Sequence, residues 1–517
     1  LFGLSFQGDI AKDKSGYGKG APSNLIQYVT WSGNVYDTEK DLQLKDFNSS
    51  LERSTMVGMF GRVAYNYKQK YFLSVTLRRD ASSKFGENTR WGTFPSYAIA
   101  YTFTEEPYMD WARDFLDFGK VRLSYGKSGK QFEYPYFAFG VLIVNNVPFH
   151  GNQTITPYWP DGLINPKLSW EETKQFDAGL DLEFFGNRLS FELDYYYRYT
   201  DKLLAQVTLP GDYNAYISQW QNAYAISNQG IELQIKADFV RSEKLHWDFS
   251  FNIARNWNRF EKSNNGMDFT NLASKHNLNI IGKPLNGIYV YNDQGYYNSQ
   301  DEVPLYYVNG RRKYLSSLGN QIYTPGDRRI QDVDGNGQVA TMVPLLEDRV
   351  YGGSPLPLAF GGIATTLKWK GIDVNLLFSY KLGRHVLNAG RGASVGTILR
   401  ANTAEMMVPI LADLDKVSFW QKPGDNTDFP INELENGKNN FATNLKSNVE
   451  KINYLKLKSI SIGYTLPVFP KQSKHYARVF MSVENVFTIT NSSSPDPESI
   501  DIVTGVDSNN NYPLATR

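Results

Sequence analysis

The sequence has no cysteine among its 517 residues. This absence excludes disulfide bonds, thiolate metal sites and cysteine nucleophiles. It also has no run near the ~18 consecutive apolar residues that a membrane-spanning helix needs, and its mean hydropathy is −0.44. The 54 Lys and Arg balance 53 Asp and Glu, and the resulting net charge of +1 gives no bulk attraction to nucleic acid or to an acidic partner.

Arrangements of side chains typical of catalysis are also missing. The five histidines are scattered, and none pairs with another at the spacing of metal ligands. The acidic pairs Glu105-Glu106 and Glu171-Glu172 place their side chains on opposite faces of a strand, whereas a glycosidase pair must converge on one bond. The segment 126–130, G-K-S-G-K, lacks the spacing of a phosphate-binding loop. We therefore predict that the protein is not an enzyme.

Aromatic residues and alternating strands are abundant instead. Tyr, Phe and Trp number 34, 31 and 10 and make up 15% of the chain, as suits β-strands or an interfacial belt. Apolar and polar residues alternate with a period of two, which predicts strands that bury one face and wet the other. The clearest segments are 73–78, 176–184, 189–198, 231–239, 247–253, 372–380 and 477–484.

The connections between these strands alternate between short and long. Phe185-Gly186-Asn187-Arg188, Lys68-Gln69-Lys70 and Lys370-Gly371 predict tight turns. By contrast, roughly a hundred residues separate Asn258 from Leu356 and about seventy separate Lys381 from Lys451, far beyond ordinary loop lengths. Short turns at one end and long loops at the other are typical of an outer-membrane β-barrel with one face toward lipid and one toward a watery lumen.

Several strings of residues, in order along the whole chain, resemble the SusC/RagA-like branch of TonB-dependent outer-membrane transporters. They include F-G-R-V-A-Y-N-Y-K (60–68), L-R-R-D-A-S-S-K-F-G (77–86), R-W-G-T-F-P-S (90–96), N-P-K-L-S-W-E-E-T-K-Q-F-D-A-G-L-D (165–181), N-Q-G-I-E-L (228–233), G-K-P-L-N-G (282–287), K-P-G-D (422–425), Y-L-K-L-K-S-I-S-I-G-Y-T-L-P (454–467), V-E-N-V-F-T (483–488) and Y-P-L (512–514).

The resemblance implies an all-β fold, part of a transmembrane antiparallel barrel of about 22 strands. Residues 1–517 would form the barrel portion, with roughly fifteen strands of spanning length. Residues 258–356 would be a long extracellular loop region. The N-terminus is neither a signal peptide nor an initiator. The periplasmic N-terminal domain, the plug and the final strand that the resemblance implies have no counterpart in this sequence. Because an open edge in lipid is too costly, we expect missing chain at one or both ends.

The resemblance also implies a function. It indicates TonB-dependent import of oligosaccharides or oligopeptides across the outer membrane of a Gram-negative bacterium of the Bacteroidota. The implied partners are a SusD-like lipoprotein lid, the TonB–ExbB–ExbD complex acting through the missing N-terminal part, and outer-membrane lipid with lipopolysaccharide, but no nucleic acid. Two alternatives stay open, namely a structural subunit of a larger outer-membrane complex and a soluble β-rich glycan-binding protein.

One acidic loop resembles the front half of a calcium site. Asp332, Asp334 and Asn336 occupy its first, third and fifth positions, and Gln338 offers a backbone carbonyl after the turn at Gly337. The twelfth position holds Val343, so Glu347 or Asp348 would close the site only if residues 340–346 bulge out. We expect a structural divalent ion, Ca²⁺, in this loop. The alternative is a solvated turn without metal.

Four aromatic residues in the long connections are candidates for stacking on a substrate: Tyr158, Trp159, Tyr296 and Tyr297. The alternative is that they pack the loops onto one another or onto a lid protein.

Overall fold

The computed structural model describes most of the chain. The described residues are 1–18, 36–37, 42–43, 45–134, 136, 138–139, 142–144, 158–160, 163–209, 218–242, 244–263, 266, 269–270, 277–308, 310–317, 320–339, 348–389, 418–431, 444–466, 477–494 and 496–507.

The chain divides into two compact units. One comprises Leu1–Tyr101, Leu123–Phe176 and Arg198–Ala225, and the other comprises Thr102–Arg122, Asp177–Tyr197 and Ile226–Arg517. Most of the long strands belong to one sheet.

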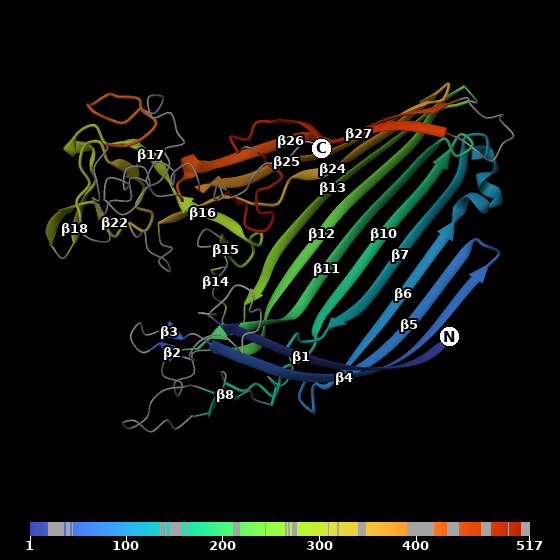
Figure 1. The fold of residues 1–517 in the computed structure, drawn as a ribbon, viewed down its shortest axis with the longest axis horizontal. Coiled ribbons are helices and arrows are strands. Elements are labelled where there is room, and N and C mark those ends of the chain that lie inside the picture. The colour runs from blue at the N-terminus through green and yellow to red at the C-terminus, as the bar shows by residue number, and fades with distance from the viewer. Residues whose placement is uncertain are drawn as a thin grey trace. The chain divides into compact units, whose positions relative to one another are not determined.

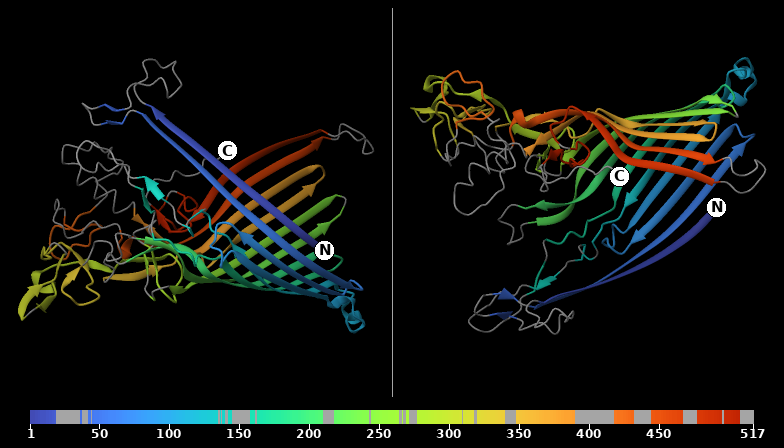
Figure 2. Two further views of the ribbon diagram at one scale, coloured as in Figure 1. Left: turned by 90° about the horizontal axis from the view of Figure 1, so that it is seen from below. Right: turned by 45° about the horizontal axis from the view of Figure 1, so that its top comes forward.

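That sheet has 14 strands in the order β1-β4-β5-β6-β7-β10-β11-β12-β13-β24-β25-β26-β27, and β28 pairs with β25. Figure 1 shows β24, β25 and β26 side by side within the second unit, and the long β1 and β4 pair, dark blue, is clear in both views of Figure 2. The strands are β1 (Phe2–Gly18), β4 (Lys45–Tyr67), β5 (Tyr71–Ser82), β6 (Trp91–Thr102), β7 (Leu116–Lys130), β10 (Glu171–Phe184), β11 (Leu189–Thr208), β12 (Ser218–Arg241), β13 (Leu245–Ser263), β24 (Ala359–Trp369), β25 (Ile372–Asn388), β26 (Val449–Leu466), β27 (Ala477–Thr490) and β28 (Val506–Asp507).

Short strands and 3₁₀ helices occupy the connections. The strands are β2 (Tyr36–Asp37), β3 (Leu42–Gln43), β8 (Leu142–Val144), β9 (Tyr158–Pro160), β14 (Phe269–Thr270), β15 (Asn277–Asn279), β16 (Gly287–Tyr291), β17 (Asp293–Tyr296), β18 (Leu305–Val308), β19 (Arg311–Tyr314), β20 (Ser316–Ser317), β21 (Arg328–Ile330), β22 (Gln338–Val339) and β23 (Arg349–Gly353). The helices are η2 (Phe103–Glu105), η3 (Pro107–Ala112), η4 (Gln300–Glu302) and η6 (Lys446–Asn448). Among the described residues, no helix has the length and apolar character to cross a membrane.

The tight turns lie where the sequence predicted them. Lys370 and Gly371 join β24 to β25 with φ angles of 47° and 89°. Positive φ at both central residues gives a hairpin the twist that its flanking strands need. Between β10 and β11, Phe185, Gly186 and Asn187 also have positive φ. The predicted tight turns are therefore confirmed.

The strands run further than their alternating segments predicted. β13 continues to Ser263 instead of ending near Asn258, and β25 continues to Asn388 instead of Tyr380. Lipid imposes alternation only across an apolar band about 25 Å tall. Beyond that band a strand keeps its hydrogen bonds while its side chains become mixed, so periodicity underestimates its length.

One face of the sheet exposes many large apolar side chains. In a water-soluble monomer so large a patch would be unusual, whereas lipid covers the outer face of a membrane barrel. Examples from the strands are Val63, Tyr65, Leu73, Leu77, Trp247, Leu367, Ile372, Leu382, Ile462, Val479, Met481 and Ile489, all between 37% and 69% exposed.

An aromatic cluster packs at the long-loop end of β5, β6 and β10, within the first unit. Trp170 is 5% exposed, and its ring lies 5.2 Å from the ring of Phe85 and 5.5 Å from that of Phe94. Its indole Nε1 donates a hydrogen bond of 2.9 Å to the Arg90 carbonyl. The residue therefore ties the segment before β10 to the loop between β5 and β6.

Replacing this tryptophan tests the cluster. Trp170→Ala removes a buried ring and leaves a cavity, so we expect the free energy of unfolding to fall by about 3–5 kcal/mol. Denaturant titration of the protein in lipid vesicles measures the change. The matched control is Trp111→Ala, since Trp111 is 71% exposed and its loss should cost less than about 1 kcal/mol. Equal losses for the two variants would contradict a structural role for the cluster.

Candidate functional site

The connection between β13 and β24 has a hydrophobic core of its own. Eight buried residues form it: Tyr291, Tyr297, Val303, Leu315, Tyr323, Ile330, Val339 and Leu445. Leu445 comes from the connection between β25 and β26, and the N–H of Tyr291 donates a hydrogen bond of 2.9 Å to the Asn444 carbonyl. Two long loops are therefore packed into one body rather than lying free in solvent.

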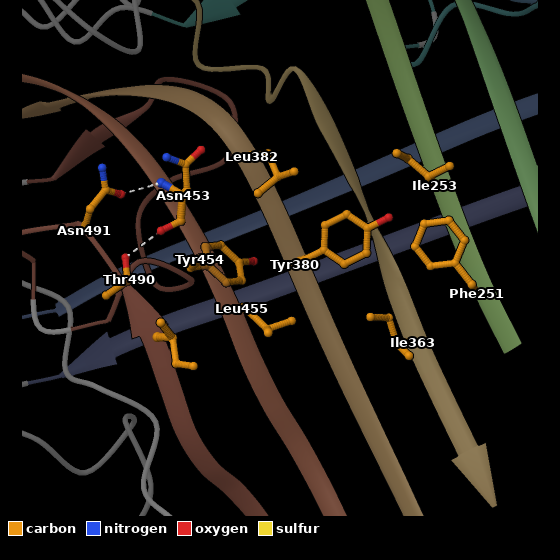
Figure 3. Close-up of a pocket in the computed structure, with 11 residues that line it drawn as sticks. Phe251, Ile253, Ile363, Tyr380, Leu382, Asn453, Tyr454, Leu455, Thr490 and Asn491 are labelled. Carbon is orange, nitrogen blue, oxygen red and sulfur yellow. Dashed lines mark hydrogen bonds between the residues drawn. The ribbon is translucent and has the colours of Figure 1, made fainter. Parts of the chain in front are cut away.

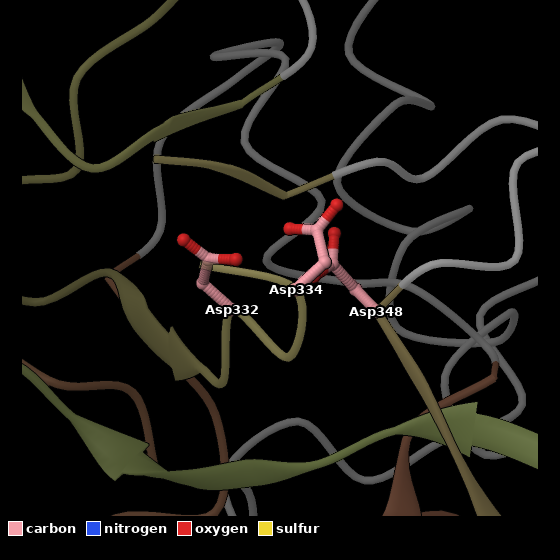
Figure 4. Close-up of side chains that lie close together, drawn as sticks. All are labelled: Asp332, Asp334 and Asp348. Carbon is pink, nitrogen blue, oxygen red and sulfur yellow. The ribbon is translucent and has the colours of Figure 1, made fainter. Parts of the chain in front are cut away.

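The acidic loop lies on this body and brings three carboxylates together. Oxygen atoms of Asp332, Asp334 and Asp348 all lie within 4.8 Å of one another (Figure 4). Asp348 is fully buried, whereas Asp334 is exposed. Spacing alone suggested Asp332 and Asp334, and proximity in sequence made Asp348 the candidate to complete them. Glu347 and the expected bulge at residues 340–346 lie outside the described residues.

Backbone hydrogen bonds hold the loop in its turn. The Asp332 carboxylate accepts from the N–H of Gly335 at 2.8 Å and of Gly337 at 2.9 Å. Asp348 accepts from the N–H of Val333 at 2.9 Å, which fastens the start of the loop to the start of β23. Gly335 and Gly337 have φ of 75° and 81°, a backbone region that favours glycine.

The set of donor atoms fits a hard cation. Carboxylate oxygens are the ligands that Ca²⁺ prefers, and each oxygen keeps a lone pair beyond the one that binds an N–H. The side-chain amides of Asn336 and Gln338 both have hydrogen-bond partners. Asn336 donates to Asp334 at 2.7 Å and accepts from the N–H of Gln338 at 2.7 Å, and the side chain of Gln338 donates to Asn320 at 2.8 Å.

Tyr306 covers the loop from the side of the hydrophobic core. A Cβ placed on Gly337 would lie 3.2 Å from the Tyr306 ring, so glycine lets the ring approach. Burial, together with a hydrogen bond to Asp332 and the charge of that carboxylate, raises the pKa of the Tyr306 hydroxyl to about 12. The sequence pattern gave no sign of this residue, because its contact depends on the packing of β18.

Two of the four aromatic candidates take packing positions. Tyr297 is 1% exposed, and its ring lies 6.2 Å from that of Tyr323. Tyr296 is half-buried, with its hydroxyl donating to the Thr427 carbonyl at 3.3 Å and Arg328 over its ring. The structure therefore favours loop packing for both. The backbone of Tyr158 and Trp159 lies in β9, and their side chains lie outside the described ones.

Ion pairs cross the polar face of the sheet. The Arg122 guanidinium on β7 donates two hydrogen bonds, of 2.8 and 2.7 Å, to Asp181 on β10 and also lies 3.0 Å from Asp194 on β11. Gly179 makes this reach possible, because a Cβ there would lie 2.6 Å from the Arg122 guanidinium carbon. Elsewhere, Glu172 bridges Lys127 at 2.7 Å and Lys202 at 2.9 Å.

A segment after β27 lies against the same polar face. The Lys456 ammonium, 3% exposed, pairs with Asp496 at 3.0 Å and Glu498 at 3.2 Å. The buried Arg384 guanidinium donates to the Pro355 carbonyl at 2.9 Å and to the backbone of Ile500 at 3.4 Å. Residues 496–501 are thereby held against the polar side of β25 and β26.

The family model "TonB dependent receptor-like, beta-barrel" matches residues 2–386. The chain belongs to the TonB-dependent receptor-like β-barrel family. Its place is accordingly the outer membrane of Gram-negative bacteria, and the family is not one of enzymes. The predicted all-β barrel fold is confirmed as well, since the matching model is that of the β-barrel.

Relatives of this TonB-dependent receptor-like barrel include two curated proteins. TonB-dependent receptor P3 of Formosa agariphila is 30% identical over 500 residues, which is 93% of this chain and 46% of that protein. TonB-dependent receptor SusC of Bacteroides thetaiotaomicron is 26% identical over 92% of this chain and 44% of its own length. The chain thus spans about half the length of the curated relatives it matches.

A solved structure shares the fold. "Structure of the RagAB peptide transporter" matches 98% of this chain and 51% of that chain with a TM-score of 0.69 and 22% identity. The match supports the architecture of this TonB-dependent receptor-like barrel.

The contact between Tyr306 and the acidic loop can be tested by titration. Asp332→Asn removes the negative charge and the carboxylate acceptor, so we expect the pKa of Tyr306 to fall from about 12 toward the ordinary value near 10. Absorbance titration of phenolate formation measures it, and Tyr306→Phe identifies the signal that belongs to this residue. Asp301→Asn, an exposed acid of the same loop region, is the control. An unchanged titration in Asp332→Asn would contradict the contact.

Proposed function

We propose that this chain forms the barrel portion of a transporter that imports oligomeric nutrients, oligosaccharides or oligopeptides, across the outer membrane. The observation that carries the proposal is the family match over residues 2–386. The apolar outer face and the ion-paired polar face supply the two surfaces that a barrel in lipid with a watery lumen needs.

We further propose that import depends on TonB and on a SusD-like lipoprotein lid. The curated name of the Bacteroides relative is TonB-dependent receptor SusC, and the fold neighbour is named as a RagAB peptide transporter. In this chain, the body formed by the two packed loops offers a rigid, folded surface for a lid. A loose loop would lose more conformational entropy on binding such a partner.

The alternatives differ in their support. A soluble glycan-binding protein is inconsistent with an outer-membrane barrel family. A structural subunit of a larger outer-membrane complex uses the same fold, so only transport itself separates it from an importer.

We propose that the acidic cluster holds a structural Ca²⁺ that stiffens the loop body and takes no part in chemistry. The support is the hard-oxygen donor set of Asp332, Asp334 and Asp348, with the buried Asp348 closing the loop in place of an acid at the twelfth position. Without a cation, three carboxylates so close together repel one another.

Uptake measurements test the transport proposal. Deleting the gene for this protein should reduce the uptake of one class of labelled oligomer, oligosaccharide or oligopeptide, to background, because such oligomers are too large for porins. Deleting the gene for TonB should reduce the same uptake equally. The control is uptake of a monosaccharide or single amino acid, which should not change. Normal oligomer uptake in both deletion strains, with a surface complex lost from the first, would favour the structural alternative.

Metal titration tests the calcium proposal. Tb³⁺ in place of Ca²⁺ should show luminescence sensitised by Tyr306, and Ca²⁺ should displace it with a Kd of ~10⁻⁴ to 10⁻³ M, as in extracellular modules. Asp348→Asn should weaken binding at least about tenfold, since it removes one of three charged ligands, whereas the control Asp301→Asn should not. Chelation should increase protease cleavage in the loop region while the barrel stays folded; unfolding of the barrel on chelation would contradict the proposal.

A further inference from the structure

A groove of about 710 Å³ lies across β13, β24, β25, β26 and β27 in the second unit (Figure 3). Its lining is almost entirely apolar over the strands and turns polar at one end. Lining residues from the five strands include Phe251, Tyr380, Leu382, Asn453, Leu455 and Ile489.

A glycine creates the floor of the groove. A Cβ on Gly361 would lie 2.7 Å from the Tyr380 hydroxyl oxygen and 2.0 Å from the Asn252 carbonyl oxygen, so only glycine leaves room for the tyrosine. Tyr380 crosses β24 there and donates a hydrogen bond of 2.8 Å to the Asn252 carbonyl. Its ring is nearly parallel to that of Phe251, at 5° and 6.2 Å. The two rings form a flat apolar platform.

The groove opens on the outer face of the sheet. Along β26, Tyr454 and Lys456 are buried toward residues 496 and 498, on the polar side covered by the segment after β27. Alternation turns Asn453 and Leu455 to the opposite side. Leu455 pairs with Tyr380 and with Ile489, which is 63% exposed. The platform therefore faces lipid.

The depth of the groove in the membrane can be derived from the number of residues along β25. Leu382 lies ten positions beyond Ile372, the first residue after the tight turn. At about 3.4 Å per residue along the strand and a tilt of about 40°, this separation raises it by roughly 26 Å. The apolar band of such barrels is about 25 Å tall. The groove thus lies at the outer edge of the band, beside the outer leaflet.

A positive charge and an amide stand above the apolar platform. Lys451 is exposed, shares its side of β26 with Asn453, and pairs in register with His385. In the described part of the chain, no carboxylate forms an ion pair with its ammonium. The side-chain oxygen Oδ1 of Asn453 accepts a hydrogen bond of 2.8 Å from the N–H of Gly383, so the side-chain nitrogen Nδ2 points away from Gly383. Cation and amide donor together suit an anionic head group.

We propose that this groove is a binding site for a phosphate-bearing lipid of the outer leaflet, with one acyl chain on the Phe251–Tyr380 platform and the phosphate at Lys451 and Asn453. The apolar lining of the groove, its position at the edge of the apolar band and the positive charge of Lys451 all favour this occupant. A peptide would leave its backbone unpaired in hydrocarbon. A neutral lipid would leave Lys451 without a counter-charge. Basic side chains at the membrane surface attract anionic lipid in this way. The proposal depends on the barrel lying in the outer membrane but not on which nutrient it carries.

Lipid retention tests the site. The full-length protein, Lys451→Gln, Leu382→Trp and the control Lys244→Gln are purified from their native membrane in the same mild detergent. Lys244 is exposed at the opposite, short-turn end of the strands. Native mass spectrometry then counts phosphorus-containing lipid per protein, and heat-modifiable electrophoresis confirms that each barrel is folded.

We expect Lys451→Gln to retain about fivefold less lipid, which corresponds to about 1 kcal/mol for one lysine near a charged membrane surface. Leu382→Trp, which fills the groove, should lose most of the lipid, while Lys244→Gln should match the wild type. In bilayers, dephosphorylating the lipid should abolish the difference between the wild type and Lys451→Gln. Equal lipid retention in all four proteins would overturn the site, and so would a loss of lipid in Lys244→Gln equal to that in Lys451→Gln. Loss of lipid in Leu382→Trp alone would overturn the phosphate contact.

Discussion

Backbone hydrogen bonding is the constraint on which the rest of this structure depends. Hydrocarbon offers no partner to a peptide N–H or C=O, so a chain that crosses it without long apolar helices must pair its strands with one another. That requirement sets the antiparallel ladder of β24, β25, β26 and β27. It also leaves the side chains free to specialise, with apolar residues on one face and ion pairs such as Arg122 with Asp181 on the other.

The sequence predicts those parts of the strands in which apolar and polar residues alternate, and it fails where this alternation ends. Alternation identified the membrane-level parts of β10, β11, β12, β13 and β25, and glycine and asparagine identified their turns. It missed the ends of the strands, where lipid imposes no pattern. In the candidate site, motif spacing suggested Asp332 and Asp334, and Asp348 was a candidate to close the loop; the structure brings these three carboxylates together. It could not show that Tyr297 is buried or that Tyr306 covers the loop, because both depend on contacts between segments distant in sequence.

The connection between β13 and β24 and the connection between β25 and β26 form a folded body with its own hydrophobic core. Their core of tyrosines and aliphatic residues contains residues from both sides of β24 and β25 in the sequence. Because Leu445 packs among residues 291–339, movement of either loop must involve the other. The conformation of this loop body is thus determined jointly by two connections.

The absence of a Cβ at Gly179 has a consequence for the alignment of β10 with its neighbours. Arg122 can reach Asp181 and Asp194 together only when a residue without a Cβ passes beneath its guanidinium. If β10 slipped by one residue, Ala178 or Leu180 would occupy that place, and the apolar and polar faces would exchange. A mispaired intermediate would therefore bury an uncompensated guanidinium or carboxylate. Gly179 therefore favours the native alignment of β10, because a side chain at this place in a shifted register would clash with the Arg122 guanidinium.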